Sequence, residues 1–508
     1  MGIGRRQFVR LAAAAAVAAG DRGPAQSASW GADPFTLGVA SGDPRPDGFV
    51  LWTRLAPEPL TGGGVGRGDI GVRWEIADDE MFRQTLRSGT AVAPAALAHS
   101  VHVEVAGLAP QRWYWYRFTV GDAVSPPGRA RTMPAPESMP PRLRFAFASC
   151  QHYETGFYTA YEHMAAEHPD LVFHLGDYIY EGAAQPRVRA HRGGELASLD
   201  DYRNRYALYR TDPDLQRAHA ACPWVVTWDD HEVDNNYAAA VSEDPGIGRD
   251  AFLERRAAAY QAYYEHMPLR SAQIPSGPSM RLYRGLSYGR LARFAVLDTR
   301  QYRTDQPCGD KTKPPCAAAA DPAATLLGED QRRWLYAALG ASPAVWNVMP
   351  QQVMMAQVDR LAGDEVGYSM DQWPGYSASR DRLLRHLAES RVRNPVILTG
   401  DIHSNWVNDL LADFAEPSSP VVATEFVGTS ISSGGDGGPN DGYAASVMRD
   451  NPFVKLHNAQ RGYVSCEVTP GIWTARYSVL DHVSARGAPR KMLAEFAVVD
   501  GRPGAQRS

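Results

Sequence analysis

The chain has 508 residues, of which 44% are hydrophobic and 21% are charged, and its formal net charge is −5. This length accommodates two domains or one large domain, with enough apolar material for a sizeable core. The near-balance of charges, without a basic stripe, argues against a nucleic-acid-binding surface and against electrostatic attachment to a membrane. The composition is that of an ordinary globular protein.

The first residues of the chain form a candidate export signal. Arg5 and Arg6 precede the apolar stretch Leu11–Ala19, and small residues follow that stretch. The pattern predicts a twin-arginine signal over residues 1–30, with Gly4 where serine or threonine is usual. The alternative is a tail that contains Arg-Arg by chance. No segment reaches the roughly 18 apolar residues of a transmembrane helix. From the signal we expect the twin-arginine machinery to export the folded protein to the periplasm or the medium.

Residues 31–133 are predicted to form a small N-terminal β-sandwich of the immunoglobulin or fibronectin type. Short segments, most of them with alternating hydrophobicity, are separated by turns rich in glycine and proline, which is typical of such domains. The strand-like segments are Phe49–Arg54, Val72–Ile76, Val101–Val105 and Trp113–Val120. The proline-rich stretch Met133–Pro141 then indicates a linker.

Residues 141–500 are predicted to form a larger domain of α/β (α+β) type. Apolar strands alternate there with helical segments, which implies two stacked sheets flanked by helices. The predicted helices are Gly156–Glu167, Leu199–Tyr209, Phe252–His266, Asp330–Leu339 and Ala378–Glu389. Predicted strands include Arg293–Asp298, Val345–Met349, Val421–Val427, Gly462–Val468, Trp473–Val479 and Leu493–Val499. We expect Gly434–Gly442 to be a flexible surface loop.

Four further apolar runs in this domain end in residues that can bind a metal ion. Runs of this length are typical of strands buried on both faces, and ligands of such sheets gather at the carboxyl ends of the strands. The runs are Leu143–Phe147 before Ser149-Cys150, Leu171–Leu175 before Gly176-Asp177, Trp224–Trp228 before Asp229-Asp230-His231-Glu232, and Val396–Thr399 before Gly400-Asp401-Ile402-His403. Their repetition predicts a metal-dependent active site.

The ligands after the first two runs favour a ferric ion. Asp177 follows a turn at Gly176, where its carboxylate can bridge two cations, and Tyr180 can return to the site as a phenolate. Cys150 adds a thiolate. Phenolate and thiolate together indicate Fe(III), because charged donors stabilise the ferric ion. The alternative is that Asp177 forms a turn and Tyr180 packs in the core.

The run Asp229–Glu232 supplies the candidate second-metal ligand and a catalytic group. We predict that Asp230 binds the second metal and that His231 orients or protonates the leaving oxygen. Asp229 and Glu232 are expected to orient the imidazole. A solvated turn is the alternative, although such turns seldom follow an apolar run of this kind.

The last run places Asp401 and His403 two residues apart, so both can face one site across a turn. Asn235 and Asn236 could each offer an amide oxygen to a hard cation. His174 lies inside a strand, and we expect it to be a packed, hydrogen-bonded core residue.

Five cysteines follow the signal, and export permits disulfides. Cys308 and Cys316 are close enough in sequence to close a small ring, and we predict that they pair. Cys150 is assigned to the metal. Cys222 and Cys466 are undecided, with buried free thiols as the default.

Taken together, these segments resemble the calcineurin-like metallophosphoesterases, and most closely their alkaline phosphatase D (PhoD) type, over nearly the whole exported chain. Matching segments include Gly38–Pro44, Leu51–Arg54, Phe147–Gln151, Gly176–Glu181, Trp228–Glu232, Leu297–Arg300, Pro350–Gln352 and Gly400–His403. The resemblance implies one Fe(III) with Ca(II) beside it. Around the iron it implies Cys150, Asp177, Tyr180 and His403, with Asp177 bridging to calcium, which Asp230 and Asp401 also bind. Gln351 or Gln352 stands where related enzymes usually have histidine, and an amide oxygen suits calcium.

The implied reaction is hydrolysis of phosphate esters. Paired cations lower the pKa of a bound water, which attacks phosphorus in line with the departing alcohol. Arg255 is a candidate phosphate clamp, although a salt bridge on its helix is the more common role of such a residue.

The expected substrates are small phosphomonoesters, with phosphodiesters as a second class. The alternative is a phospholipase D-type phosphodiesterase that acts on phospholipids. We expect a monomer. Intact ligand clusters argue against an exported adhesion protein. The lack of Gly-x-Gly-x-x-Gly, P-loop and Gly-x-Ser-x-Gly motifs argues against nucleotide-binding enzymes and serine hydrolases.

Overall fold

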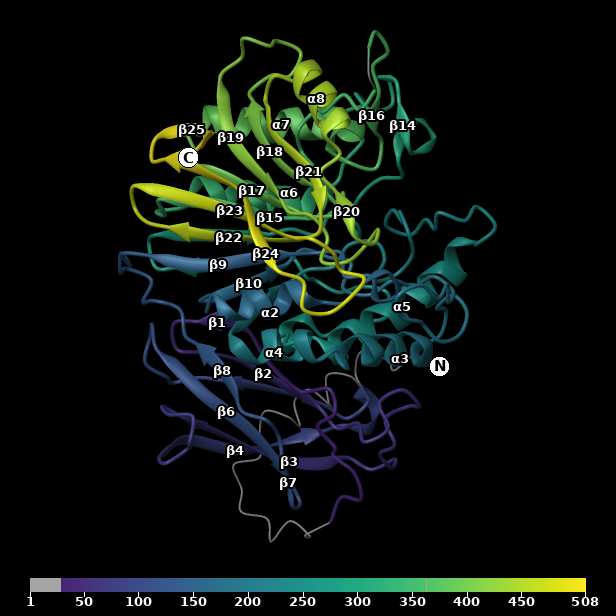
Figure 1. Ribbon diagram of the computed structural model, residues 1–508, viewed down its shortest axis with the longest axis vertical. Helices are drawn as coiled ribbons and strands as arrows, with labels where there is room; N and C mark the ends of the chain where they lie inside the picture. Colours follow the sequence, from purple (N-terminus) through teal and green to yellow (C-terminus); the bar gives the residue numbers. More distant parts are fainter. Residues whose placement is uncertain (1–28, 362) are drawn as a thin grey trace.

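Figure 1 shows the computed structural model of the chain, which describes residues 29–361 and 363–508. The predicted export signal therefore lies outside the described residues, except for its last two positions. Within the described residues, no helix is both long enough and apolar enough to cross a membrane.

A ten-stranded mixed sheet forms the centre of the molecule. Its central strands β9, β10 and β11 are parallel, and β1 runs parallel to β11 on their far side. In sheet order the strands are β25 (Arg502–Arg507), β24 (Arg490–Val499), β23 (Ile472–Leu480), β22 (Gly462–Val468), β9 (Leu143–Ala148), β10 (Leu171–His174), β11 (Pro223–Val226), β1 (Val39–Arg45), β2 (Gly48–Arg54) and β5 (Ser100–Val105).

An eight-stranded sheet stacks on one face of the first, above it in Figure 1. Four of its strands, β13, β15, β17 and β19, are parallel neighbours. In sheet order the strands are β12 (Arg284–Tyr288), β13 (Ala292–Val296), β15 (Trp346–Pro350), β17 (Pro395–Thr399), β19 (Val421–Val427), β18 (Asn405–Leu411), β21 (Val454–Gln460) and β20 (Gly437–Gly438).

Side chains that alternate along the central strands build a core on each side of the ten-stranded sheet. Phe145 and Phe173 face the second sheet, where both rings meet Phe294 of β13 at centroid distances of 5.8 and 4.8 Å. Ala146 and Val172 face the opposite side and pack beneath helices. Because both faces of these strands are buried, their sequences are continuous apolar runs.

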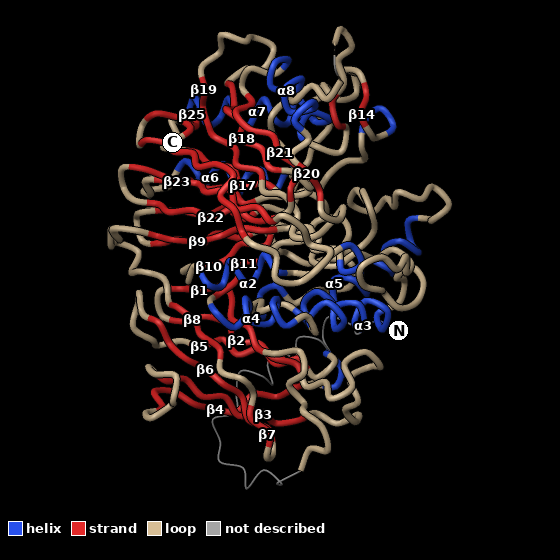
Figure 2. Tube along the Cα trace, viewed as in Figure 1, coloured by secondary structure: helices blue, strands red, loops and turns tan. Residues whose placement is uncertain are grey.

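Helices cover the outer face of each sheet (Figure 2). The helices over the ten-stranded sheet are α2 (Thr159–Ala166), α3 (Leu199–Arg210), α4 (Pro213–Ala221) and α5 (Arg249–His266). Those over the eight-stranded sheet are α6 (Gly328–Gly340), α7 (Ser377–Glu389) and α8 (Asp441–Asp450). Single 3₁₀ turns occur at Ala95–Leu97, Tyr153–Thr155, Ser271–Gln273, Pro307–Gly309 and Trp373–Tyr376. The predicted two-sheet α/β fold is confirmed. Gly434–Gly442, expected to be a flexible loop, instead contains β20 and the start of α8.

The N-terminal β-rich domain is also present, but one of its two sheets continues into the catalytic core. Its separate five-stranded sheet consists of β4 (Thr85–Ala93), β3 (Ile70–Ala77), β6 (Trp113–Val120), β7 (Ala123–Val124) and β8 (Gly128–Arg131). This sheet packs on β1, β2 and β5 around a shared apolar core. Those three strands belong to the ten-stranded sheet. The boundaries at residues 31–133 and 141–500 remain predictions.

Gly42 is the point at which the N-terminal strands join the core. It pairs with Trp224 of β11, and a Cβ atom there would lie 2.5 Å from the Pro268 carbonyl oxygen and 2.7 Å from the Trp224 carbonyl oxygen. Only glycine permits so close an approach of backbones.

Candidate metal centre

The four predicted strand ends converge on one site. Asp229 and Asp230 follow β11. Cys150 follows β9, Asp177 follows β10, and Asp401 and His403 follow β17. Left-handed backbone conformations occur at Cys150 (φ 60°), Asp177 (55°), Asp401 (64°) and His403 (56°). Such conformations cost roughly 1–3 kcal/mol each and occur chiefly at functional sites. The chain is therefore bent sharply at each strand end, which turns these side chains toward one another.

Gly176 allows the loops after β10 and β11 to meet. Its φ is 116°, and a Cβ atom on it would lie 2.4 Å from the Asp229 Cβ. Glu232 then joins the two loops, because its carboxylate accepts hydrogen bonds from the backbone N–H groups of Asp177 (3.0 Å), Asp229 (2.8 Å) and Tyr178. Glu232, predicted to orient His231, instead fixes the backbone of both loops through its carboxylate.

The potential ligand atoms form three overlapping groups, and within each group the atoms lie within 4.8 Å of one another. The groups are Cys150, Asp177 and His403; Asp177, Asp230 and His231; and Asp229, Asp230 and Asp401. Asp177 belongs to two of them, which is the position a bridging carboxylate needs. These groups contain His231 and five of the six residues predicted as metal ligands. The sixth, Tyr180, contacts Asp177 and His403, so all six belong to one cluster.

Tyr180 connects the first group through its hydroxyl. Its Oη lies 2.8 Å from Asp177 Oδ2 and 3.1 Å from His403 Nε2, and Ser433 Oγ lies 2.7 Å away. Burial raises the pKa of both Tyr180 and Cys150 well above their ordinary values, and the Asp177 carboxylate adds to the effect. A bound cation reverses this preference, because it stabilises the phenolate and the thiolate.

Several carboxylate oxygens in the cluster are buried without a hydrogen-bond donor. They are Asp177 Oδ1, Asp229 Oδ2 and Asp230 Oδ1. An unpaired buried carboxylate oxygen is costly unless it is paired with a charge or coordinates a metal. Burial also raises the pKa of Asp401 to about 6. This donor set fits one or more bound cations.

Arg300 is a central residue that the sequence analysis did not assign. It is fully buried, and its guanidinium bonds to Asp229 and Asp371 and lies 3.6 Å from Asp230 Oδ2 and 3.7 Å from Asp401 Oδ1. Burial raises the pKa of Asp230, but Arg300 and His231 bring it below its ordinary value. Arg300 therefore partly neutralises these carboxylates.

Glu181 is the group that orients His231. Its Oε2 lies 2.7 Å from His231 Nδ1, and its Oε1 accepts from the backbone N–H of Asn235. Burial lowers the pKa of His231, but Glu181 and Asp230 raise it well above its ordinary value. The sequence analysis assigned this orienting role to Asp229 and Glu232, and that expectation is corrected here: Asp229 pairs with Arg300 instead.

Arg255 does not face the candidate ligands. Its guanidinium pairs with Glu195 (2.9 Å) and Asp234 (3.1 Å), and its Nε donates to Tyr202 Oη. These are the contacts of a structural ion pair, the alternative that the sequence left open. The role of phosphate clamp predicted for Arg255 gains no support from these contacts.

Gln351 and Gln352 are both fully buried, and every polar atom of their amides is hydrogen-bonded within the protein. The expectation that one of them offers an oxygen to calcium is therefore not supported. Asn236 is better placed. Its Nδ2 donates to Asp310, its backbone N–H donates to Asp230, and it lines the pocket beside Asp401.

The cluster opens into a pocket of about 360 Å³. Gln372 lines it and donates from Nε2 to Asp401 Oδ2 at 2.8 Å. Lys311 and Arg360 lie at the same pocket. A cavity of this volume is within the range of small-molecule sites.

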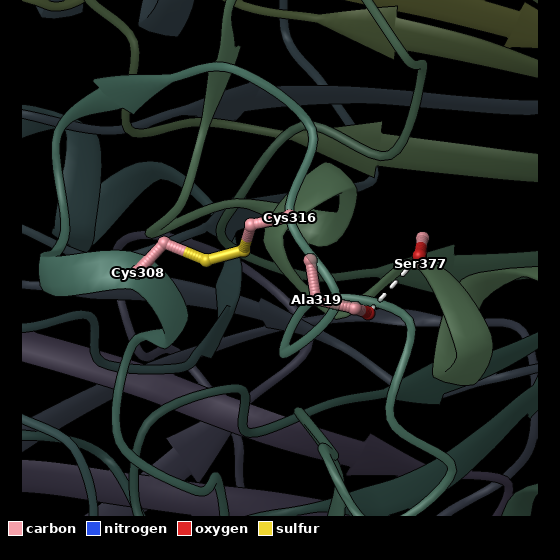
Figure 3. The surroundings of a disulfide bond; sticks show 4 residues. All are labelled: Cys308, Cys316, Ala319 and Ser377. Atoms are coloured by element: carbon pink, nitrogen blue, oxygen red, sulfur yellow. Dashed lines mark hydrogen bonds between the residues drawn. A yellow bond between two sulfur atoms is a disulfide. The ribbon is translucent and has the colours of Figure 1, made fainter.

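Beside the pocket, the Cys308–Cys316 disulfide closes a loop (Figure 3), which confirms the predicted pairing. Just after the closed loop, the carbonyl of Ala319 accepts a hydrogen bond from Ser377 at the start of α7. Cys222 and Cys466 are free and buried, which was the default expectation for them, and Cys150, assigned to the metal, also forms no disulfide.

A His–Glu–His group adjoins the cluster and was not found from the sequence. It comprises His152, Glu154 and His191, and the His152 ring lies 4.4 Å from that of Tyr180. Glu154 accepts from the backbone N–H groups of Gln185 and His191, so it anchors the loop that follows Glu181. This group supports the wall of the site.

Two stacked mixed sheets that direct thiol, phenol, imidazole and carboxylate groups to one point define a metal-dependent phosphoesterase. Residues 145–477 match the family model of PhoD-like phosphatases, and residues 17–134 match the model of their N-terminal domain. The chain therefore belongs to the PhoD-like phosphatase family, as the resemblance in its sequence predicted.

Individual relatives agree with this assignment. The chain is 51% identical to alkaline phosphatase D of Bacillus subtilis (strain 168) over 480 residues. This alignment covers 93% of this chain and 82% of that protein. It also matches the solved structure of PhoD with a TM-score of 0.92 and 50% identity, over 94% of this chain and 93% of the other. The chain is a hydrolase of small phosphate esters, and the comparisons do not favour the phospholipase alternative.

Proposed function

We propose that the chain is an exported alkaline phosphatase that acts through one Fe(III) and Ca(II). The observation that supports this most is the position of Asp177, which belongs to two ligand groups of different chemistry and keeps a buried oxygen without a donor. One group offers sulfur, phenol and imidazole. The other combines the carboxylates of Asp177 and Asp230 with the imidazole of His231, and Asp230 also belongs to an all-carboxylate group with Asp229 and Asp401.

The two groups suit different cations. Cys150, Tyr180, His403 and Asp177 would hold Fe(III), which is stabilised by charged thiolate and phenolate donors. Asp177, Asp230 and Asp401 would hold Ca(II), which takes six to eight oxygen ligands. Asn236 can add an amide oxygen, the part that the sequence analysis gave to Gln351 or Gln352.

The bound cations would supply a water of lowered pKa and would bind the phosphoryl oxygens. The protein's own part in the reaction is proton transfer and orientation. His231, held by Glu181 through Nδ1, directs Nε2 as the proton donor to the oxygen of the departing alcohol. The Glu181 carboxylate, 2.7 Å from Nδ1, favours the protonated imidazole that this task needs. Arg300 holds the carboxylates in place before the substrate arrives.

Removal of calcium tests the assignment directly. A chelator selective for calcium is expected to abolish hydrolysis of p-nitrophenyl phosphate while iron stays bound, and added Ca²⁺, but not Mg²⁺, should restore activity, because Mg²⁺ demands a tighter octahedral site. Iron and calcium contents should be measured in the same samples. Full turnover in excess chelator would contradict the calcium assignment.

We propose export by the twin-arginine machinery, based on Arg5, Arg6 and the apolar stretch after them. This route carries folded proteins, so a centre buried between two sheets can be assembled before export. Replacing both arginines by lysine should leave active enzyme in the cytoplasm, as measured by fractionation and phosphatase assay. Unchanged export of that variant would refute the signal. We further propose a monomer, to be checked by size-exclusion chromatography with light scattering.

A further inference from the structure

Two cationic side chains at the pocket have no part in the mechanism described above. Lys311 is exposed and Arg360 is half-buried, and both line the pocket together with Asp401 and His403. Within residues 29–361 and 363–508, neither is within ion-pair distance of a carboxylate. Arg360 instead donates to Gln372 Oε1 at 2.7 Å. The positive charge of both residues is therefore available to a ligand.

The loop that carries Lys311 is held in place by several contacts. The Cys308–Cys316 disulfide closes it (Figure 3), and its two-residue strand β14 (Thr312–Lys313) pairs with β16 (Tyr368–Ser369). The carbonyl of Lys311 accepts from the backbone N–H of Met370 at 2.9 Å. Lys311 thus projects from a braced turn, and its backbone has a left-handed φ of 61°.

Most carboxylates of the pocket have partners other than Lys311 and Arg360, although Asp310 Oδ1 has no hydrogen-bond partner. Asp371 pairs with Arg300 and Arg303, Asp401 is a candidate metal ligand, and Asp310 Oδ2 accepts from Asn236 Nδ2 at 2.8 Å. They form no ion pair with Lys311 or Arg360, although Asp401 and Asp371 act on Arg360 electrostatically at longer range. The loop and the segment before β16 therefore bring two positively charged side chains without a direct ion-pair partner to the rim of the metal centre.

We propose that Lys311 and Arg360 form a second anion-binding position, which binds a negative group on the leaving part of the substrate. This inference rests on the proposed function and narrows it to phosphate esters whose alcohol carries its own negative charge. In the proposed function the bound cations would compensate the phosphoryl group at the base of the pocket, and Arg300 is already engaged with Asp229 and Asp371. The volume of about 360 Å³ leaves room for a leaving group between that base and the rim.

The test uses two substrates that differ in one group. Glycerol 3-phosphate has a neutral leaving alcohol, and 3-phosphoglycerate has a carboxylate on an alcohol of the same length. The ratio of kcat/KM for 3-phosphoglycerate to that for glycerol 3-phosphate is measured with the metal-loaded enzyme. The double variant Lys311→Gln/Arg360→Gln should lower this ratio about tenfold to a hundredfold, because two charge-assisted contacts are lost. Lys313→Gln, on the same loop, is the matched control and should leave the ratio unchanged.

The outcomes separate the possible roles. An equal fall for both substrates would place the two cations on the phosphoryl group and overturn the inference, as would an unchanged ratio. No hydrolysis of glycerol 3-phosphate by the wild-type enzyme would refute the proposed function itself, and the inference with it.

Two further measurements do not depend on the folding of the double variant. The wild-type ratio should fall as salt is raised from about 0.05 M to about 0.5 M, because salt screens exposed charges, and a ratio independent of salt would contradict the proposal. Cys308→Ser/Cys316→Ser should lower the ratio with little change for glycerol 3-phosphate. An unchanged ratio in that variant would contradict a role of the braced Lys311 turn in binding the leaving group.

Discussion

Replacement of Cys150 by alanine is expected to remove both bound iron and phosphatase activity. The thiol is one of three donors within 4.8 Å of one another, and the bend of the chain at φ 60° presents it to Asp177 and His403. The loss should exceed the roughly 10- to 100-fold reduction that follows loss of a residue hydrogen-bonded to a metal ligand. Iron content and kcat are the quantities to measure, on protein purified after metal loading.

Cys222→Ala provides the matched control for that experiment. Cys222 is also a free, fully buried cysteine, but it packs in the apolar core beneath α4. Its replacement should leave iron and activity intact and lower stability by about 1 kcal/mol, as loss of a small buried group does. A Cys150→Ala enzyme that keeps its iron and turns over would refute the thiolate assignment.

Replacement of His231 by asparagine is expected to lower kcat by roughly 10²- to 10⁴-fold, the usual contribution of a general acid. The loss should be largest for alkyl phosphates and smallest for nitrophenyl phosphate, because a good leaving group needs little protonation. The measurement is kcat across substrates whose leaving alcohols differ in pKa. Bound iron and calcium should be unchanged, since His231 is not among the proposed ligands.

Glu181→Gln is the companion variant, because it keeps the size of the side chain that orients His231 and removes its charge. A smaller loss, about 10- to 100-fold, is expected with the same dependence on the leaving group. If His231→Asn slowed all substrates equally, or released a metal, the histidine would be a ligand and not a proton donor.

The candidate ligands could be predicted from sequence because each directly follows a strand that is buried on both faces. Such strands are recognisable as apolar runs, and the carboxyl ends of the parallel neighbours β9, β10 and β11 share one edge of their sheet. Asp401 and His403 come from β17 of the second sheet, so only the stacking of the two sheets brings them to that edge. Arg300 was harder to assign, because an arginine after a strand has the same local pattern whether it faces solvent or four carboxylates. Only the fold shows that Asp229, Asp230, Asp371 and Asp401 surround it.

The partner of His231 was mispredicted for a related reason. Adjacent residues in the run Asp229–Glu232 point in different directions once the chain turns, so proximity in sequence does not determine which carboxylate meets the imidazole. Glu181, fifty positions earlier, does so because Glu232 binds the two loops together. Ser433 lies in a glycine-rich stretch with no pattern of its own, and its contact with Tyr180 follows from tertiary packing alone.

The continuity of the ten-stranded sheet has a consequence for the order of folding during synthesis. The middle strands β9, β10 and β11 lie between N-terminal β1 on one side and C-terminal β22 on the other. Until the ribosome has produced β22, β9 presents an unpaired edge of buried-type sequence, which is prone to aggregation. This aggregation hazard therefore persists until β22, close to the C-terminal end of the sequence, pairs with β9.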